Sequence, residues 1–212
     1  MFDAQLSWSA PPVHLTALER WTLRSGATAC LRPVRADDAG ALEAMLFRQS
    51  RASRYHRFHS AINGLTPKQL ARLTCSDDPL QLGLVLSIDG VQGTLVAEAR
   101  YASEDGRSAE VALIVDEAWR RQGIGWRALG VLVRAARERG LHSLHGRVLD
   151  GNDPMLALVR RAGWPTSRDA DDARVRCFHI DLDCAFNAKV NAQASAPAAA
   201  GHETSRAAPC VH

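Results

Sequence analysis

A strand, a basic glycine-rich loop and a helix follow one another between residues 109 and 139, and this succession constrains the fold more than any other part of the chain. Residues 111–115 are all apolar, as in a buried strand. A helical pattern then places apolar residues at positions 129, 132, 133 and 136 and stops at Gly140. Residues 144–149 predict another strand, which a helical crossover places parallel to the first by a right-handed connection.

The loop between this strand and helix has the chemistry of a phosphate site. It carries Arg120, Arg121, Gly123 and Gly125. Glycine lets backbone N–H groups turn toward a ligand, and the first helical turn adds unpaired donors and the positive end of the helix dipole. Arginine adds a permanent forked charge. Many such turns only link a strand to a helix, so the loop by itself leaves both interpretations open.

The remaining pattern predicts a mixed sheet. Residues 28–34 read as a strand in which Pro33 indicates either an edge position or a strand end, and Asp37 is a candidate cap for the helix that follows. Residues 80–88 and 91–101 read as an antiparallel pair joined by a hairpin turn at Asp89-Gly90, and residues 103–107 form the next turn. Residues 175–182 alternate as a last strand.

Composition indicates one globular domain with flanking segments. The chain has 212 residues, of which 46% are hydrophobic and 23% charged, as is usual for a globular domain. We expect an irregular leader over residues 1–26, in which tryptophans can pack onto the domain, a folded domain over 27–184, and a disordered low-complexity tail over 185–212.

Charge and cysteine content narrow the functional class. The net charge of +3 is too diffuse for a nucleic-acid surface, and no apolar run approaches the roughly 20 residues of a membrane span. The five cysteines form no C-x-x-C pair, which favours reduced thiols and a cytoplasmic location. We expect no nucleic acid, membrane or metal among the partners, and a monomer or homodimer.

Arg120-Arg121-Gln122-Gly123-Ile124-Gly125 resembles the Arg/Gln-x-x-Gly-x-Gly/Ala signature of the GNAT family of acyl-CoA-dependent N-acetyltransferases. Asn152, Leu158 and the pair Gly163-Trp164 resemble a second pattern of that family. The likeness spans about residues 28–182. It implies an α/β (α+β) fold: a mixed, mostly antiparallel twisted sheet of about six to seven strands, helices on both faces and a central parallel strand pair.

A narrower resemblance points to the acceptor. Residues 53–58, 73–74, 109–115 and 152–158 are similar to the catalytic domain of bacterial Pat-type protein lysine acetyltransferases. This likeness implies transfer of an acetyl group from acetyl-CoA to a protein lysine, with Glu110 as the catalytic base. A small-molecule amine is the alternative acceptor, and a non-catalytic acyl-CoA-binding sensor is the alternative function.

Glu110 also suits the chemistry of a base. A lysine amine, with a pKa of about 10.4, is protonated at neutral pH and must lose a proton before it attacks. Partial desolvation in an apolar strand would raise the pKa of the carboxylate toward the working range. A solvated edge residue or half of an ion pair is the other interpretation, and His56, His142 and His145 are alternative bases.

The family resemblance also implies which residues hold the coenzyme. The backbone of the strand end would pair with the pantetheine amides, the loop would bind the pyrophosphate, and an asparagine side chain would bind the pantetheine arm. The residues expected in these roles are Ile114, Val115, Arg120, Arg121, Gln122, Gly123, Ile124, Gly125, Trp126 and Asn152.

Two residues depart from the family pattern. Val159 stands where many relatives carry a tyrosine thought to protonate the leaving thiolate, so no general acid is assigned. Trp126 is bulkier than the residues usual after the second glycine, and it either covers the pyrophosphate or packs on the sheet. No cysteine lies in the loop, which favours direct attack by the amine in a ternary complex.

Overall fold

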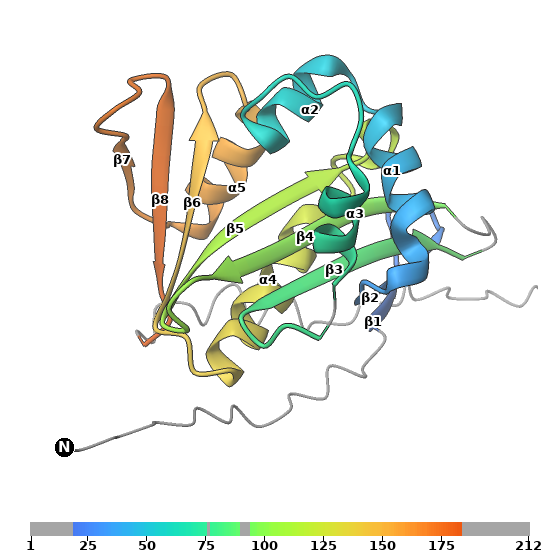
Figure 1. Cartoon of the computed structure of the whole chain (residues 1–212), viewed down its shortest axis with the longest axis horizontal. Helices are drawn as coiled ribbons and strands as arrows, with labels where there is room; N and C mark the ends of the chain where they lie inside the picture. Colours follow the sequence, from blue (N-terminus) through green and yellow to red (C-terminus); the bar gives the residue numbers. More distant parts are fainter. Residues whose placement is uncertain (1–18, 76, 90–93, 184–212) are drawn as a thin grey trace, which may run out of the picture.

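The computed structural model describes residues 19–75, 77–89 and 94–183 and shows one twisted sheet flanked by helices (Figure 1). The eight strands lie in the order β1-β2-β3-β4-β5-β6-β8-β7. The strands are β1 (Glu19–Thr22), β2 (Thr28–Pro33), β3 (Gln81–Ile88), β4 (Leu95–Ser103), β5 (Ser108–Val115), β6 (Ser143–Leu149), β7 (Thr166–Arg168) and β8 (Val175–Asp181). The helices are η1 (Ala36–Asp38), α1 (Ala39–Arg48), α2 (Arg51–Phe58), α3 (Pro67–Thr74), η2 (Glu117–Trp119), α4 (Ile124–Glu138) and α5 (Asp153–Ala162).

The predicted mixed sheet is confirmed. Strands β3, β4 and β5 form an antiparallel meander, and β6 is parallel to β5, as the helical crossover requires. The sheet is larger than the six to seven strands expected, because the short edge strands β1 and β7 were not predicted. Both are too short to give a clear alternating pattern in the sequence.

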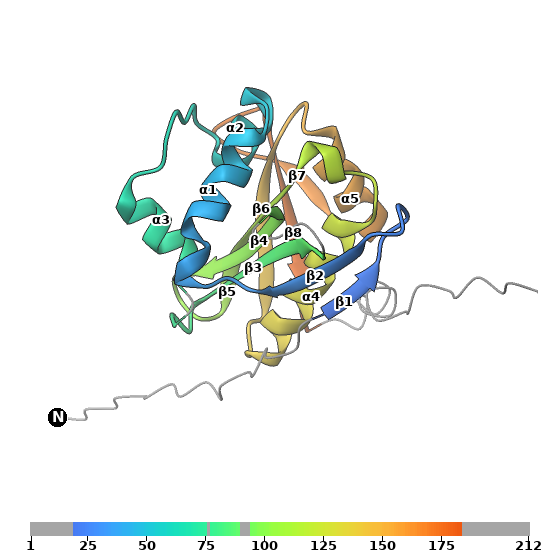
Figure 2. The same ribbon diagram turned by 90° about the vertical axis from the view of Figure 1, so that its right-hand side faces the viewer.

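Helices cover both faces of the sheet (Figure 2). On one side, α4 and α5 enclose the main apolar core, in which Leu129, Leu132 and Leu144 are completely buried. On the other side, α1 and α3 cover a smaller core that includes Leu42 and Ile114. The parallel pair lies between these layers.

The interpretation of residues 1–26 as an irregular leader is corrected for its last part. Residues Glu19–Thr22 form β1, which pairs antiparallel with β2. Its Glu19 forms ion pairs with Arg127 and Arg134 of α4, and Trp21 stacks against Arg127 at 4.5 Å. One of the tryptophans thus packs onto the domain, as expected. Residues 1–18 and the tail from 184 lie outside the described residues.

The start of the first long helix also differs from expectation. The neighbouring Asp38, rather than Asp37, makes the stabilising contacts: its carboxylate accepts a hydrogen bond from Arg35 N at 2.8 Å and pairs with both Nη atoms of Arg32. The predicted strand end at Pro33 is confirmed. The hairpin turn expected at Asp89-Gly90 involves residue 90, outside the described part of the chain.

The parallel strands β5 and β6 pair over a short length and then separate. Their register joins Ser108 to Ser143, Ala109 to Leu144 and Glu110 to His145. Both strands continue past this point, and Figure 1 shows them diverging toward their carboxyl ends. The backbones of β5 and β6 therefore separate after Glu110, and this backbone separation is called the gap below.

Gly146 lies where this gap begins. A Cβ atom built on it would come within 2.5 Å of Cε1 and Cζ of Phe178 and within 3.2 Å of the Val111 carbonyl oxygen. The ring of Phe178 stacks on Trp164 with centroids 5.7 Å apart. Only glycine leaves room for this ring beside the backbone of β5.

The Gly146→Ala variant should therefore lower the free energy of unfolding by about 1–3 kcal/mol, the usual cost of overpacking a core. Urea denaturation measures the change. Gly64→Ala is the matched control, because a Cβ there meets nothing within 4 Å. If the two variants have equal free energies of unfolding, the ring of Phe178 moves aside for the added Cβ without loss of stability.

No helix in the described part of the chain is both long and apolar enough to span a membrane.

Candidate functional site

The backbone of β5 faces the gap at alternate residues. The hydrogen bond from Asp116 N to Val96 O, 2.8 Å long, sets the phase of the antiparallel ladder between β4 and β5. In this phase the N–H and C=O groups of Ile114 point toward β4, and those of Leu113 and Val115 point into the gap. Leu113 therefore takes the position that the sequence analysis assigned to Ile114, whose side chain is buried against α1.

The loop after β5 presents backbone donors without a side-chain cap. Arg121 and Gly123 have positive φ angles of 62° and 85°, and Gly123 is the N-cap of α4. No side chain accepts a hydrogen bond at this cap, so the N–H groups of the first turn remain available for an anion. The exposed Arg121 forms no hydrogen bond or ion pair with another described residue, which leaves its charge for a ligand.

The second glycine of the loop has a different role. A Cβ on Gly125 would lie 3.2 Å from Cδ2 of Leu113 and from Cδ1 of Leu158, so this position lets β5, α4 and α5 approach closely. Trp126 is 8% exposed and packs in the main core, with the guanidinium of Arg161 4.4 Å from its ring centroid. Of the two alternatives for Trp126, the structure thus shows core packing.

The conformation of Gly123 predicts a selective loss of coenzyme affinity. In Gly123→Val, a β-branched residue at a φ of 85° is strained by about 1–2 kcal/mol. If the loop changes its conformation to relieve this strain, its N–H groups no longer point at the ligand, and the Kd for CoA should rise roughly tenfold or more. Gly123→Asn is the control, because asparagine tolerates positive φ. Calorimetric titration with CoA measures both. Similar affinities for the two variants would contradict a role for this backbone conformation.

Arg120 is not available to a phosphate in the same way as Arg121. Its Nε donates to the Val115 carbonyl at 3.2 Å, and its Nη2 donates to Ser53 Oγ at 2.8 Å. Glu117 is 3.7 Å away. Arg120 therefore connects the end of β5 to α2. Sequence reasoning missed this connection because Ser53 is 67 residues away along the chain.

Asn152 lies at the carboxyl end of β6 and caps α5. Its Oδ1 accepts a hydrogen bond from Met155 N at 3.3 Å, so its Nδ2 remains as a donor. This orientation suits a carbonyl acceptor such as those of the pantetheine arm. The first turn of α5 follows the end of β6, and Leu158 on the same helix lies beside Gly125 of α4.

Glu110 is exposed at the last paired position of β5, where the gap begins. The desolvation expected for its carboxylate is therefore not present. Glu110 shares a face of β5 with Ile114, the face toward α1 and α3, and α2 contacts β5 on this side. Glu110 is thus accessible to an acceptor that approaches beside α2.

His59 lies at the end of α2 in the electrostatic field of Glu110. It has a φ of 52° and is half-buried. Burial lowers the pKa of His59, the charge of Arg147 lowers it further, and the Glu110 carboxylate opposes the shift. Of the histidines considered as alternative bases, His145 is the cross-strand partner of Glu110, with its Nδ1 3.1 Å from Ser108 Oγ.

The buried carboxylate of this region is Glu98, which the sequence analysis did not single out. Glu98 is 2% exposed and lies opposite Ile114 on β4. Arg57 of α2 donates to its Oε2 from Nε and Nη2 at 3.2 and 3.0 Å, and Arg100 Nε lies 3.3 Å from its Oε1. Burial lowers the pKa of Arg100, and Glu98 opposes that shift. The sequence signal that could have identified Glu98 is a carboxylate within an apolar run. Glu110 has the same signal.

The structure supplies no tyrosine on α5. Val159 is 1% exposed and packs in the main core. The chain has two tyrosines. Tyr101 is completely buried and accepts a hydrogen bond from Arg139, and Tyr55 is exposed on α2. The thiolate therefore has no proton donor at the position usual in relatives.

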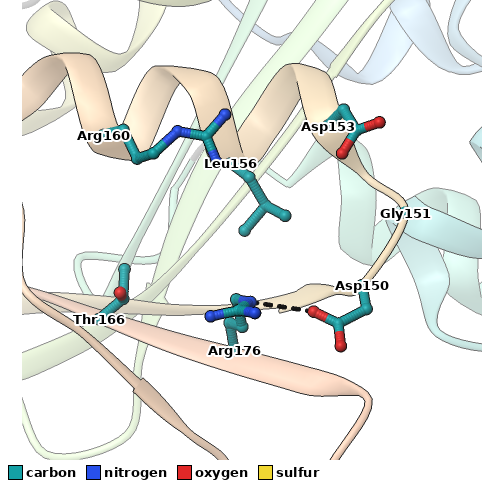
Figure 3. A pocket seen from close by; sticks show the side chains of 7 residues that line it. All are labelled: Asp150, Gly151, Asp153, Leu156, Arg160, Thr166 and Arg176. Atoms are coloured by element: carbon teal, nitrogen blue, oxygen red, sulfur yellow. Dashed lines mark hydrogen bonds and ion pairs between the residues drawn. The ribbon is translucent and has the colours of Figure 1, made fainter.

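A separate cavity of about 380 Å³ lies between α5 and the strands β7 and β8 (Figure 3). Arg160, Arg176, Asp150 and Asp153 contribute charges of both signs, and Arg176 pairs with Asp150 at 2.9 Å. None of the residues expected to bind the coenzyme lines it. Within residues 19–75, 77–89 and 94–183, no group of three or more histidine, cysteine or acidic side chains is arranged to hold a metal ion.

Comparisons with known proteins bear on the family of this chain. A family model described as the acetyltransferase (GNAT) family matches residues 47–164, more than half of the 212-residue chain. The acetyltransferase Pat of Mycolicibacterium smegmatis is 32% identical over 77 residues, which are 35% of this chain and 23% of that protein. The aligned part is thus less than a quarter of that relative.

Solved structures extend the likeness over most of the fold. The GNAT domain of S. lividans PAT is 28% identical with a TM-score of 0.71, covering 80% of this chain and 98% of that domain. A cAMP-binding acyltransferase from Mycobacterium smegmatis, 23% identical with a TM-score of 0.55 over 85% of this chain and 56% of its own, shares the fold. The chain therefore belongs to the acetyltransferase (GNAT) family.

Proposed function

We propose that the protein transfers an acetyl group from acetyl-CoA to an amine by direct attack in a ternary complex, with a protein lysine as the acceptor. One observation carries the proposal: Glu110 is exposed at the start of the gap between β5 and β6, and the uncapped amino terminus of α4 lies at the far end of β5. A carboxylate and an anion site thus lie at opposite ends of the part of β5 that does not pair with β6.

In the proposed reaction, the gap holds the extended part of the substrate thioester. The backbone of Leu113 and Val115 pairs with the pantetheine amides, and the loop N–H groups and Arg121 bind the pyrophosphate. Asn152 Nδ2 donates to a pantetheine carbonyl. These contacts direct the acyl group toward Glu110.

Transfer then needs a base for the acceptor ammonium group. Glu110 accepts one of its protons, and the neutral nitrogen attacks the thioester carbon to form a tetrahedral intermediate. The C–S bond then breaks, and the nitrogen loses its second proton to solvent to give the amide. A backbone N–H on the gap side of β5 stabilises the oxyanion. The thiolate takes its proton from solvent, since Val159 offers none.

The choice of lysine as acceptor rests on the resemblance of residues 53–58 and 109–115 to Pat-type enzymes, and a small-molecule amine is the alternative. A non-catalytic acyl-CoA-binding sensor is the second candidate function, favoured by the buried valine at the usual acid position. We also propose that the protein acts in the cytoplasm, on the basis of its cysteine pattern, without nucleic acid, membrane or metal, as a monomer or homodimer.

A thiol-release assay with acetyl-CoA tests the proposal. The wild-type protein is incubated with lysine-containing peptides, proteins and small amines, and free CoA is measured. Release that depends on a lysine substrate supports the proposal, and release with small amines alone reassigns the acceptor. Tight acetyl-CoA binding without release on any acceptor would favour the sensor.

A further inference from the structure

Helix α2 is attached to the rest of the molecule by polar contacts on one side. Ser53 and Arg57 are four residues apart and so lie on the same face of the helix. Ser53 is 9% exposed and contacts the coenzyme loop, and Arg57 forms the ion pair with buried Glu98. At the carboxyl end of α2, His59 lies in the electrostatic field of Glu110. The helix therefore joins the loop region to the region of the base.

Glu117 forms several of the hydrogen bonds that join the loop to α2 and to the residues just before it. Its Oε1 accepts hydrogen bonds from Ser53 Oγ at 2.5 Å, Ser50 Oγ at 2.7 Å and Ser50 N at 3.2 Å. Its own N–H donates to Gln49 Oε1 at 3.0 Å. Hydrogen bonds from Ser50 and Ser53 hold the pKa of Glu117 below its ordinary value, so the carboxylate stays ionised. One residue of η2 thus holds the junction of α1 and α2.

Arg120 extends this network to the strand edge. The same guanidinium donates to Ser53 Oγ on α2 and to the Val115 carbonyl, which faces the gap. A phosphate at the loop would compete for Arg120, and a pantetheine amide would compete for the Val115 carbonyl. Any ligand that fills the loop and the gap therefore acts on groups that also hold α2.

We propose that Ser53, Glu117 and Arg120 are positioning residues that transmit occupancy of the coenzyme loop to α2, so that the acceptor side of the site becomes ordered when the coenzyme is bound. This inference rests on the proposed function, in which coenzyme phosphates bind the loop and the amine enters beside α2. Glu117 retains its contacts to Ser53 while Arg120 exchanges partners, and the fixed loop then holds α2 in place.

Hydrogen exchange measured by mass spectrometry tests the coupling without any acceptor. CoA should slow exchange in the loop, residues 116–126, and also in α2, residues 51–58, of the wild-type protein. In Ser53→Ala and Glu117→Gln, protection of the loop should remain and protection of α2 should fall by roughly two- to tenfold, the range that one hydrogen bond accounts for. Ser53→Thr retains the hydroxyl group and should retain the coupling.

Glu43→Gln is the matched control. Glu43 lies on the neighbouring helix α1 and forms no hydrogen bond or ion pair with another described residue. This variant should show the wild-type protection of α2. Glu117→Gln removes the charge of the acceptor, and Ser53→Ala removes a donor of the same contact. Either variant alone therefore tests the coupling if the other fails to fold.

The kinetic constants provide a second readout. In Ser53→Ala and Glu117→Gln, the KM for the amine should rise roughly two- to tenfold, while the Kd for CoA changes less than about twofold. An unchanged KM in both variants, or equal α2 protection in both variants and wild type, would overturn the inference. Failure of CoA to protect the loop in wild type would instead overturn the proposed function. Loop protection without α2 protection in wild type would overturn the coupling alone.

Discussion

Replacing Glu110 with glutamine should lower kcat/KM for the amine by roughly 10²–10⁴-fold, the usual contribution of a general base. Glutamine preserves the shape of the side chain but cannot accept the proton. Because Glu110 lies at the closed end of the gap, away from the loop, the Kd for CoA should stay within about twofold of wild type. Steady-state thiol release and calorimetric titration with CoA measure the two quantities.

The matched control for this variant is Glu104→Gln, an exposed residue in the turn before β5 that forms no hydrogen bond or ion pair with another described residue. Its kcat/KM should equal that of wild type. Wild-type turnover in Glu110→Gln would remove Glu110 as the base. The His145→Gln variant would then be the next measurement, because His145 is its cross-strand partner.

Replacing Glu98 with leucine should lower the free energy of unfolding by about 3–5 kcal/mol, the cost of leaving a buried charge without its partner. Arg57 and Arg100 have side chains that are 9% and 10% exposed, so neither can turn into water without moving α2 or α3. Arg100 also donates to the Leu73 carbonyl at the end of α3. Thermal or urea denaturation measures the loss.

Two comparisons identify the cause of this loss. Asp89→Ala removes one member of an exposed pair with Arg20, whose side chains are 58% and 41% exposed, and should cost less than about 1 kcal/mol. Adding Arg57→Leu to Glu98→Leu should restore part of the stability, because one unpaired buried charge is removed. A fully additive loss in the double variant would show that packing, and not charge, determines the effect.

Much of the architecture was predictable from local sequence. An apolar run at residues 111–115 is followed by a helix ending at Gly140 and then by another apolar run. A strand, a helix and a strand in this order form a parallel pair with a right-handed connection. The glycine-rich loop at the amino terminus of α4 was predicted from the same stretch, because backbone freedom at Gly123 and charge at Arg121 are properties of single residues.

The strand register and the direction in which each residue of β5 points could be determined only from the tertiary structure. Alternation along β5 shows which residues share a face, but only the ladder with β4 shows that Leu113 and Val115 point into the gap and Ile114 does not. Two carboxylates, Glu98 and Glu110, occupy similar apolar strands. Glu98 lies under Arg57 of α2, and Glu110 lies where the strand pair ends, so one is buried and the other exposed.

The sequence by itself thus determined the order of strand, loop and helix that makes an anion site and a parallel pair, because those properties depend on neighbouring residues. Only the tertiary structure decided that Arg120 connects Val115 to Ser53 and that α2 stands between the loop and Glu110. These contacts join segments far apart in the chain. Their partners depend on how α2 packs across the sheet, and no local pattern encodes that arrangement.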